Sequence, residues 1–390
     1  MLTPGYVVKL DLGKAQGWLV IDFFVMGVSW GGIRILPDVT RSETELLARM
    51  MTLKSALAGI PVGGAKIGIA ANPWRCDKIS LIKRLAYSLR DLLLRGRYIA
   101  GTDMGFWDED LQYLYSLLGV TRQFTLHKVG DGVSLTGIAV ATSLCASIDE
   151  LVAFYRMTDV ETVALEGFGN MGSAAAKMLE KRGYTLIAVS NRYHTLLDEA
   201  LDIQLLLDLR RAYGEECLRI YREKRPSARL LPAESISSIP VDIFIPGTRP
   251  LTISNKPACM IIAPLSNYPM SMASCRELEE KGVHVIPDII STAGGSIGSA
   301  LTLLGRRFED DLSIIDRLTR YNIKRVLGLA QNRGKTALEE AYRIAWRRIK
   351  MLRLLGPYYL AEYMKTWVVV GKGDLFKKIF RVIQYLAAPS

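Results

Sequence analysis

Histidine and cysteine are scarce in this sequence. Its 390 residues include 3 histidines and 5 cysteines, with no Cys-x-x-Cys pair and no histidine spacing typical of metal ligands. We therefore expect no zinc site and no disulfide framework. An odd number of widely spaced cysteines favours a reducing compartment, and we expect the cytoplasm. The cysteines are Cys76, Cys145, Cys217, Cys259 and Cys275.

The sequence also lacks an apolar segment typical of a membrane span or a signal peptide. One long uncharged stretch, residues 289–305, contains threonine, serine and several glycines. Such a composition indicates a buried loop and the start of a helix. The N-terminus shows no basic region followed by an apolar core, so we expect no signal peptide and no stable membrane insertion.

Runs of like charge are absent as well. The formal net charge is +11, but no five consecutive residues carry charges of one sign, and no basic stretch is interleaved with aromatic residues. We therefore expect no nucleic-acid partner, and the positive balance fits an anionic small molecule or a dinucleotide. At 390 residues the chain is too long for one ordinary core, which predicts two domains.

In the first region we predict strands, one capped helix and a glycine-rich loop. Apolar runs at residues 6–12 and 18–28 predict a strand pair. Thr40 and Glu43 form a capping-box pattern that begins a helix, and Gly59 ends it. The segment Gly-Gly-Ala-Lys-Ile-Gly at residues 63–68 breaks the helical pattern and is predicted to be a loop.

From about residue 135 onward, predicted strands and helices alternate. This alternation predicts an α/β protein with a Rossmann-like domain and a mostly parallel, doubly wound sheet. We expect a substrate domain over residues 1–134, an NAD(P)-binding domain over 135–299, and C-terminal helices over 300–390. The predicted strands are 163–165, 185–189, 241–245, 260–263 and 283–286, and the predicted helices of the chain are 79–94, 109–118, 137–151, 173–182, 312–329 and 335–354.

A glycine fingerprint follows the first of these strands. The residues Gly167, Phe168, Gly169, Asn170, Met171 and Gly172 match Gly-x-Gly-x-x-Gly between a strand and a helix. The glycines permit a tight turn, an approach of pyrophosphate to the backbone, and close helix–strand packing. We expect NAD or NADP here, although a purely structural turn has the same pattern.

The end of the next strand offers a clue to the cofactor. An acidic residue that binds the ribose hydroxyls of NAD is common at this place, whereas this chain has Asn191 and Arg192. Asn191 does not repel a 2′-phosphate, and Arg192 can pair with one. A solvated turn explains the same residues, so the choice between NAD and NADP stays open.

Two lysines and one aspartate of the first region are candidate site residues. Lys54 shares a helical face with apolar residues, and Lys66 lies in a small, apolar segment. A desolvated lysine loses several pKa units and becomes a base near neutral pH. Asp103 is a carboxylate that can exchange protons with it. Surface or capping roles are the commoner fate of such residues on chemistry alone.

Several ordered motifs resemble the glutamate/leucine/phenylalanine/valine dehydrogenase superfamily. The resemblance covers about residues 20–352. The motifs are Gly31-Gly32-Ile33-Arg34, Pro37-Asp38-Val39-Thr40, residues 51–59, Pro61-Val62-Gly63-Gly64-Ala65-Lys66, Gly101-Thr102-Asp103-Met104-Gly105, Leu135-Thr136-Gly137, residues 167–172, Pro287-Asp288-Ile289, Ala293-Gly294-Gly295 and residues 341–345.

This resemblance implies an NAD(P)-dependent oxidative deamination of an L-amino acid, with Lys66 and Asp103 as the catalytic pair. It implies that Lys54 binds the substrate α-carboxylate, and we expect backbone contacts to substrate from Gly31 and Gly32. The remaining implied contacts are Ser299 to the substrate side chain and Thr136, Gly247, Thr248 and Asn267 to the cofactor. A homo-oligomer, hexameric or other, is also expected.

The departures from the family pattern concern the substrate. Glutamate enzymes place a lysine directly before the Gly-Gly of the first motif, and this chain has Trp30. Trp30 favours an apolar or aromatic substrate side chain, as in leucine-type relatives. The motifs as a whole are closer in sequence to those of glutamate enzymes. Ala139, residues 264–266 and Thr292 also differ, which leaves a catalytically weak paralogue with a regulatory or structural role as an alternative.

Residues 357–390 extend beyond the resemblance. Asp374 can cap a helix with a one-sided apolar stripe that ends near Leu386. Such a stripe should not stay exposed. Docking onto its own domain, a subunit interface and a membrane surface are the three alternatives.

Overall fold

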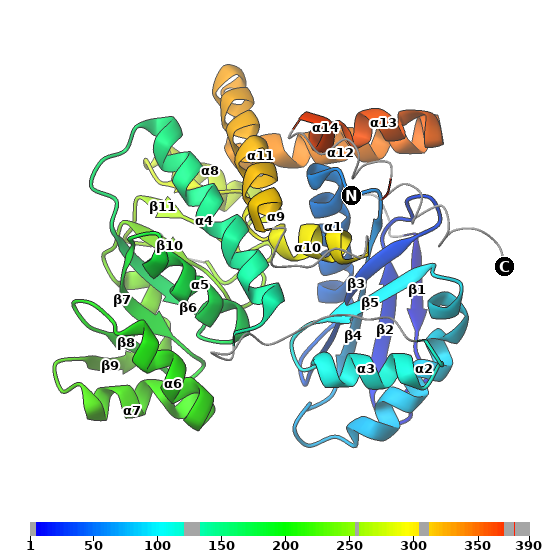
Figure 1. Ribbon diagram of the computed structural model, residues 1–390, viewed down its shortest axis with the longest axis horizontal. Helices are drawn as coiled ribbons and strands as arrows, with labels where there is room; N and C mark the ends of the chain where they lie inside the picture. Colours follow the sequence, from blue (N-terminus) through cyan, green and yellow to red (C-terminus); the bar gives the residue numbers. More distant parts are fainter. Residues whose placement is uncertain (1–4, 121–132, 254–256, 304–311, 370–377, 379–390) are drawn as a thin grey trace. The chain divides into compact units, whose positions relative to one another are not determined.

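The computed structural model describes residues 5–120, 133–253, 257–303, 312–369 and 378. The chain divides into two compact units. The first unit comprises residues 1–125, 302–304 and 345–390, and the second comprises residues 126–301 and 305–344. Figure 1 shows a sheet with associated helices in each unit. The predicted α/β fold class is confirmed.

A five-stranded mixed sheet organises the first unit. Its order is β1-β2-β4-β3-β5; β1/β2 and β2/β4 are antiparallel, while β3 pairs in parallel with β4 and β5. The helix α1 packs along β4 and β2, and α2 and α3 pack against β5. The elements are β1 (Tyr6–Lys9), β2 (Gln16–Ile21), β3 (Ser29–Leu36), α1 (Arg41–Ala58), β4 (Gly63–Ala70), α2 (Lys78–Leu94), β5 (Tyr98–Thr102) and α3 (Asp108–Ser116).

The predicted helix that begins after Thr40 is confirmed as α1. The Thr40 side chain accepts a hydrogen bond from the Glu43 amide, as an N-cap residue does. Gly59 ends the helix with φ of 69°, a left-handed conformation that glycine adopts without strain.

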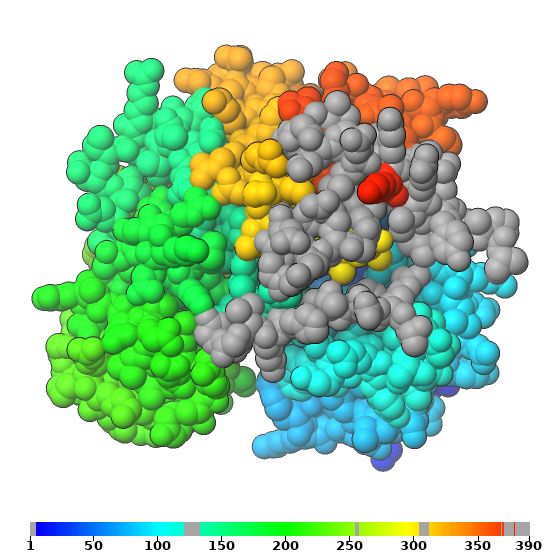
Figure 2. Space-filling model, in the orientation of Figure 1, coloured from blue at the N-terminus to red at the C-terminus, as the bar shows by residue number. Residues whose placement is uncertain are grey.

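The helices α2 and α3, blue to cyan, lie on the surface of the first unit (Figure 2).

Two predictions for this unit were wrong. Residues 63–68 form most of the buried strand β4, not a loop. The glycines of this strand are there for packing: a Cβ at Gly64 would lie 2.2 Å from the Thr52 amide nitrogen, and one at Gly68 would lie 2.1 Å from Thr44 Oγ1. They let α1 lie close against the strand. The second predicted strand, 18–28, is too long, because β2 ends at Ile21 and the next strand, β3, begins only at Ser29.

A seven-stranded sheet organises the second unit. Its order is β12-β11-β10-β6-β7-β8-β9, parallel from β12 to β7 and antiparallel at β8 and β9. The predicted βαβ unit is present as β6, α5 and β7. The strands are β6 (Thr162–Glu166), β7 (Thr185–Ser190), β8 (His194–Leu197), β9 (Arg229–Pro232), β10 (Ile243–Ile245), β11 (Ile261–Ile262) and β12 (His284–Val285).

Helices surround this sheet, and α4 is the most apolar of them. By length and composition α4 is able to span a membrane, but 67% of its apolar window is buried inside the protein. It is therefore a core helix. The helices are α4 (Leu135–Tyr155), α5 (Asn170–Lys181), α6 (Ile203–Tyr213), α7 (Cys217–Lys224), α8 (Met272–Glu280), α9 (Asp288–Ser291), α10 (Gly294–Thr302), α11 (Leu312–Arg333) and α12 (Ala337–Leu355).

The chain after α12 packs onto the first unit. It forms the turn η4 (Gly356–Tyr359) and the short helices α13 (Leu360–Tyr363) and α14 (Lys365–Val369). The buried Trp367 donates from Nε1 to the Ala58 carbonyl at 3.0 Å, and Arg348 donates to the Ala56 and Leu57 carbonyls at 2.8 Å. These donors satisfy the last carbonyls of α1. The helix predicted after Asp374 lies outside the described residues.

Candidate active site

Strand alternation brings the candidate residues of the first unit onto one face of the sheet. Trp30 of β3 pairs with Gly64 of β4, and Arg34 pairs with Gly68. Alternate residues of a strand share a face, so these four lie on the same side as Lys66. Gly64 and Gly68 abut α1. The site is therefore built on the face that α1 covers.

The charged residues of this face form one cluster. Lys66 Nζ contacts Asp103 Oδ2 in an ion pair. Arg34 donates to both oxygens of the same carboxylate, from Nε to Oδ2 at 3.1 Å and from Nη2 to Oδ1 at 3.3 Å. Arg34 Nη1 also donates to Glu43 Oε1 at 2.7 Å. Two cations and two carboxylates thus neutralise each other in a site where Lys66 and Arg34 are each 5% exposed.

Burial and charge shift the titration of this cluster in opposite directions. Burial lowers the pKa of Lys66; Asp103 opposes this effect and Arg34 reinforces it. Burial alone would raise the pKa of Asp103, but Arg34 and Lys66 overcome it and hold that pKa well below its usual range. The site therefore combines an ionised carboxylate with a lysine that gives up its proton more easily than an exposed one.

Gly32 keeps the space beside this pair open. A Cβ on Gly32 would lie 2.6 Å from the Thr102 carbonyl oxygen and 3.2 Å from Lys66 Nζ. At Gly31 a Cβ would lie 1.7 Å from the Ala65 carbonyl oxygen, and the Gly31 carbonyl accepts a hydrogen bond from the Tyr98 hydroxyl at 2.8 Å. Neither position tolerates a side chain, and at Gly32 a side chain would press on the Lys66 amine.

Trp30 lies on the same face of the sheet, and Lys54 lies on the helix α1 that covers it. Trp30 is 4% exposed, and its Nε1 donates to Ser55 Oγ at 2.9 Å. Lys54 precedes Ser55 on α1 and is also buried. The sequence placed both residues in the substrate site. In the structure Trp30 lies on β3, which carries Arg34, and Lys54 lies on α1, which carries Glu43.

The glycine fingerprint of the second unit adopts the geometry that a dinucleotide needs. Gly167 has φ of 91°, and a Cβ at Gly172 would lie 1.8 Å from the Gly167 carbonyl oxygen, so helix α5 packs directly on the turn. A Cβ at Gly169 would meet no heavy atom within 4 Å, so its backbone faces open space. Asn170 and Met171 begin α5, whose N-terminal amides suit a phosphate. Phe168 is buried.

Residues from the neighbouring strand complete this turn. The Gly247 amide donates to Glu166 Oε2 at 3.1 Å, and Thr248 Cγ2 would lie 3.4 Å from a Cβ at Gly167. Burial raises the pKa of Glu166, against hydrogen bonds from Thr248 and Gly247. Glu166 was not predicted; its signal is a carboxylate that ends an apolar strand directly before the fingerprint.

Asn191 and Arg192 differ in how they are held. Asn191 Oδ1 accepts from the amides of Tyr193 and His194 at 2.9 Å, and its Nδ2 donates to the Glu215 carbonyl at 2.6 Å. It therefore shapes the turn. Arg192 is exposed and lies 3.6 Å from the Glu215 carboxylate, so its guanidinium remains near the surface.

The other implied contacts gather around α10 and the end of β11. The methyl group of Thr136 would lie 3.6 Å from a Cβ at Gly295, and the exposed Ser299 donates to the Gly295 carbonyl at 2.8 Å. Asn267 is half-buried. Ser266 Oγ beside it is buried without a hydrogen-bond partner among the described residues, a feature that fits a bound polar group.

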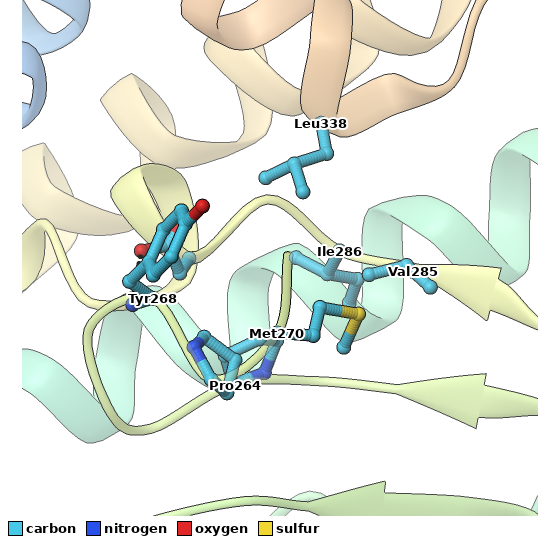
Figure 3. Close-up of a pocket in the computed structure, with 8 residues that line it drawn as sticks. Pro264, Tyr268, Met270, Val285, Ile286 and Leu338 are labelled. Atoms are coloured by element: carbon cyan, nitrogen blue, oxygen red, sulfur yellow. Dashed lines mark hydrogen bonds between the residues drawn. The ribbon is translucent and has the colours of Figure 1, made fainter. Parts of the chain in front are cut away.

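A small pocket, shown in Figure 3, adjoins Asn267. Tyr268 has φ of 52°, unusual for a residue with a side chain. Asp288 holds it there: Oδ2 accepts from the Tyr268 amide at 2.7 Å, and Oδ1 accepts from the Tyr342 hydroxyl at 3.2 Å. Asp288 thus fixes the turn that carries Asn267. The lining residues are Pro264, Tyr268, Pro269, Met270, Val285, Ile286, Asp288 and Leu338.

The departures at three positions are accommodated by packing. The Ala139 carbonyl lies against Gly294, where any Cβ would come within 1.8 Å of it. Thr292 Oγ1 donates to the Asp288 carbonyl at 2.6 Å. The Pro264 carbonyl accepts from Ser291 Oγ at 2.6 Å.

Arg34 is a second site residue, besides Glu166, that sequence reasoning missed. It lies within the Gly31-Gly32-Ile33-Arg34 motif, but no role was predicted for its side chain. The available signal was parity: Trp30, Gly32 and Arg34 alternate along one face. Glu43 was interpreted only as a helix-capping residue, whereas its side chain also binds Arg34.

The chain matches two family models along most of its length. Residues 6–118 match the Glu/Leu/Phe/Val dehydrogenase dimerisation domain, and residues 132–354 match the Glutamate/Leucine/Phenylalanine/Valine dehydrogenase model. A glutamate dehydrogenase of Aeropyrum pernix is 30% identical over 387 residues, which cover 91% of each chain. An NADP(+)-dependent glutamate dehydrogenase of Pyrobaculum calidifontis is 30% identical over 332 residues, 75% of this chain and 74% of the relative.

Solved structures show the same fold. The hetero-hexameric glutamate dehydrogenase from Thermus thermophilus in its Leu-bound form superimposes with a TM-score of 0.77 at 23% identity, covering 90% of each chain. The L-tryptophan dehydrogenase from Nostoc punctiforme gives 0.61 at 22% identity, covering 90% of this chain and 97% of the other. The predictions of an amino-acid dehydrogenase and of NAD or NADP are confirmed at family level: this chain belongs to the glutamate/leucine/phenylalanine/valine dehydrogenase family.

Proposed function

We propose that Lys66 and Asp103 carry out the oxidative deamination of an L-amino acid in this chain. The observation that carries this proposal is the Lys66–Asp103 ion pair, buried beside the space that Gly32 leaves open. The residues of the fingerprint turn fit NAD(P), which when bound accepts the hydride from the substrate Cα. The overall change is amino acid, oxidised cofactor and water to 2-oxo acid, ammonium, reduced cofactor and a proton.

Lys66 acts as the base in this proposal. Its pKa is lowered, so the neutral amine is available to take a proton from the water that attacks the imino acid. Asp103 is ionised in the resting site, where it directs the lysine through Oδ2, and it takes up and returns a proton transiently as ammonia leaves. Lys54 supplies a cation for the substrate α-carboxylate, and Gly31 and Gly32 allow substrate to approach the backbone.

Glutamate is the first candidate substrate, because the relatives from A. pernix and P. calidifontis are glutamate dehydrogenases. An amino acid with an apolar side chain is the second candidate, and Trp30 favours it. Trp30 is buried and anchored to Ser55, so it presents a fixed apolar wall. Burying a glutamate γ-carboxylate against such a wall without a cation costs several kcal/mol.

The test is a steady-state assay with glutamate, leucine, phenylalanine and tryptophan, each with NAD and with NADP. A kcat/KM for glutamate above the other three supports the first candidate, and the reverse order supports the second. No turnover by folded protein that still binds NADPH or NADH would reject the enzyme and support a regulatory or structural paralogue.

The same proposal extends to cofactor choice, assembly and location. Arg192 is exposed at the end of β7 and is available for a 2′-phosphate after leaving Glu215, which supports NADP or dual use. The match to a dimerisation domain supports a homo-oligomer, and we propose a cytoplasmic enzyme without nucleic-acid or membrane partners. Light scattering of the purified protein measures the oligomer directly.

A further inference from the structure

The Asp103 carboxylate is held by other donors in addition to Lys66, its catalytic partner. Oδ1 accepts from Arg34 Nη2 at 3.3 Å and from the Met104 amide at 2.7 Å. Oδ2 accepts from Arg34 Nε at 3.1 Å and contacts Lys66 Nζ. A carboxylate offers about four lone-pair sites, and here all four are used.

Arg34 itself has little freedom. Its guanidinium forms a fork on Asp103, and its remaining Nη1 donates to Glu43 Oε1 at 2.7 Å. The side chains of Arg34 and Glu43 are 6% and 12% exposed, so neither is loosened by water as a surface pair would be. Glu43 is fixed in turn by its place in the first turn of α1. The chain Glu43–Arg34–Asp103–Lys66 therefore connects α1, β3, the end of β5 and β4.

We propose that Arg34 is a positioning residue: anchored by Glu43, it fixes the Asp103 carboxylate against Lys66, and the Arg34–Glu43 pair sets the charge state of that lysine. The role rests on the proposed function of Lys66 and Asp103 and extends it to two residues that touch neither substrate nor cofactor. A bidentate fork sets both distance and orientation of a carboxylate, which an ammonium does not.

The charges facing Lys66 give this role a signature. Arg34 lowers the pKa of Lys66, whereas Asp103 and Glu43 raise it, and burial is the largest influence. The hydroxyl of Tyr98 from β5 also faces Asp103. Burial, and to a smaller extent Asp103, raise the pKa of Tyr98 well above its ordinary value, so this hydroxyl stays neutral. Removing the Arg34 charge should therefore move the titration of Lys66 to higher pH. Removing the Glu43 charge should move it to lower pH.

The test uses Arg34→Gln, Glu43→Gln and the matched control Glu45→Gln. Glu45 lies on the same helix and pairs with Arg41, which is 59% exposed, so its replacement should leave Lys66 unchanged. The first readout is the rate of Lys66 acetylation by limiting acetic anhydride at a series of pH values, quantified by mass spectrometry against the exposed Lys83. It reports the neutral amine whether or not the enzyme turns over.

The expected result is a pair of opposite shifts in the two variants and none in the control. Folded variants that shift in the same direction, or not at all, would overturn the proposal. If Arg34→Gln does not fold, Glu43→Gln decides alone, since an unshifted or upward-shifted Lys66 contradicts the role of the pair.

The second readout is kinetic and uses Arg34→Lys. This variant keeps the charge and loses the fork, so Lys66 should titrate as in the unaltered protein while kcat falls by about 10²-fold, the scale of a misplaced catalytic group, and KM changes little. An unchanged kcat would refute positioning by the fork. Loss of the proposed function would show itself differently, as no turnover in the unaltered enzyme with the acetylation shifts still present.

Discussion

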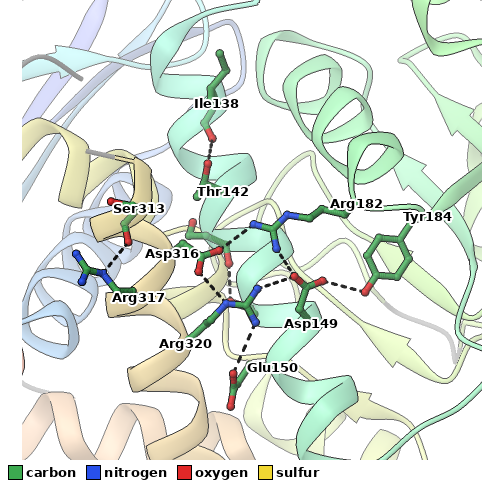
Figure 4. A network of polar contacts seen from close by, with 12 residues as sticks. Ile138, Thr142, Asp149, Glu150, Arg182, Tyr184, Ser313, Asp316, Arg317 and Arg320 are labelled. Carbon is green, nitrogen blue, oxygen red and sulfur yellow. Dashed lines mark hydrogen bonds and ion pairs between the residues drawn. The ribbon is translucent and has the colours of Figure 1, made fainter. Parts of the chain in front are cut away.

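Each unit of this protein contains a network of ion pairs, and the two networks differ in burial. In the first unit, Arg34 and Lys66 share the Asp103 carboxylate beneath α1. In the second unit, Arg182 and Arg320 share Asp149 and Asp316 among α4, α5 and α11 (Figure 4). The two arginines of the second network are 29% and 31% exposed, whereas Arg34 and Lys66 of the first network are almost fully buried.

The difference in burial indicates which network belongs to the active site and which one stabilises helix packing. Partly exposed ion pairs are screened by water and contribute about 0–1 kcal/mol of stability each. Buried charges cost free energy unless they are paired, and they shift pKa values strongly. A network that is costly to bury and changes the titration of a lysine fits a functional site. The network around Asp149 joins three helices and serves packing, with Tyr184 donating to Asp149 at 3.1 Å.

The largest effect should come from removing the buried lysine. Lys66→Ala is expected to lower kcat by about 10²-fold or more, the scale of a lost general base, while cofactor affinity and folding stay near those of the unaltered protein. Stopped-flow and steady-state kinetics measure it. Lys83→Ala on the exposed side of α2 is the control, and near-normal turnover of Lys66→Ala would remove the buried network from the chemistry.

Stability of the first unit should depend strongly on the segment after α12. Trp367 is completely buried and donates to the last turn of α1, so Trp367→Ala should cost about 3–5 kcal/mol of unfolding free energy. Trp367→Phe keeps most of the volume and should cost about 1 kcal/mol for the lost hydrogen bond. Chemical denaturation compares both with Val369→Ala, whose side chain is 52% exposed. Equal costs for all three would contradict docking by this segment.

Substrate selectivity should respond to the apolar neighbour of the buried network. Trp30→Lys places a cation where glutamate enzymes of the family have one, and should raise kcat/KM for glutamate relative to leucine or phenylalanine by about tenfold, roughly 1.4 kcal/mol. Competition assays measure the ratio. Trp30→Phe should leave the ratio close to that of the unaltered enzyme. A ratio that stays constant in Trp30→Lys would show that this position does not contact the side chain.

The smallest effect is expected in the exposed network. Arg182→Gln breaks contacts to Asp149 and Asp316, but each exposed pair is worth only about 0.2–1 kcal/mol. The melting temperature should fall slightly, less so at high salt, and kcat should not change. Arg219→Gln, which breaks pairs within α7 and η1 (Gly214–Glu216), is the control. A large loss of kcat in Arg182→Gln would show that the exposed network also supports catalysis.

The sequence determined the secondary structure of the second unit well because that unit follows local rules. The fingerprint turn, the strand β6 and the helix α5 are contiguous in the chain, and alternation of strands and helices restricts the topology. The strands β8 and β9 were not predicted, since they are short and antiparallel at the edge of the sheet. The first unit was harder: the glycine-rich segment resembles a loop until the close approach of α1 explains Gly64 and Gly68, and that of the Phe23 carbonyl explains Gly63.

The sequence alone also selected Lys54, Lys66 and Asp103 as candidate residues, through motifs and the chemistry of a lysine among apolar neighbours. It did not show that Arg34 and Glu43 complete their charge balance. These residues are separated by up to 69 positions, and pairing in parallel brings β3, β4 and β5 into register. Motifs record which side chains are present, but only the packing of α1 on the sheet decides which charges are buried together, and burial sets their chemistry.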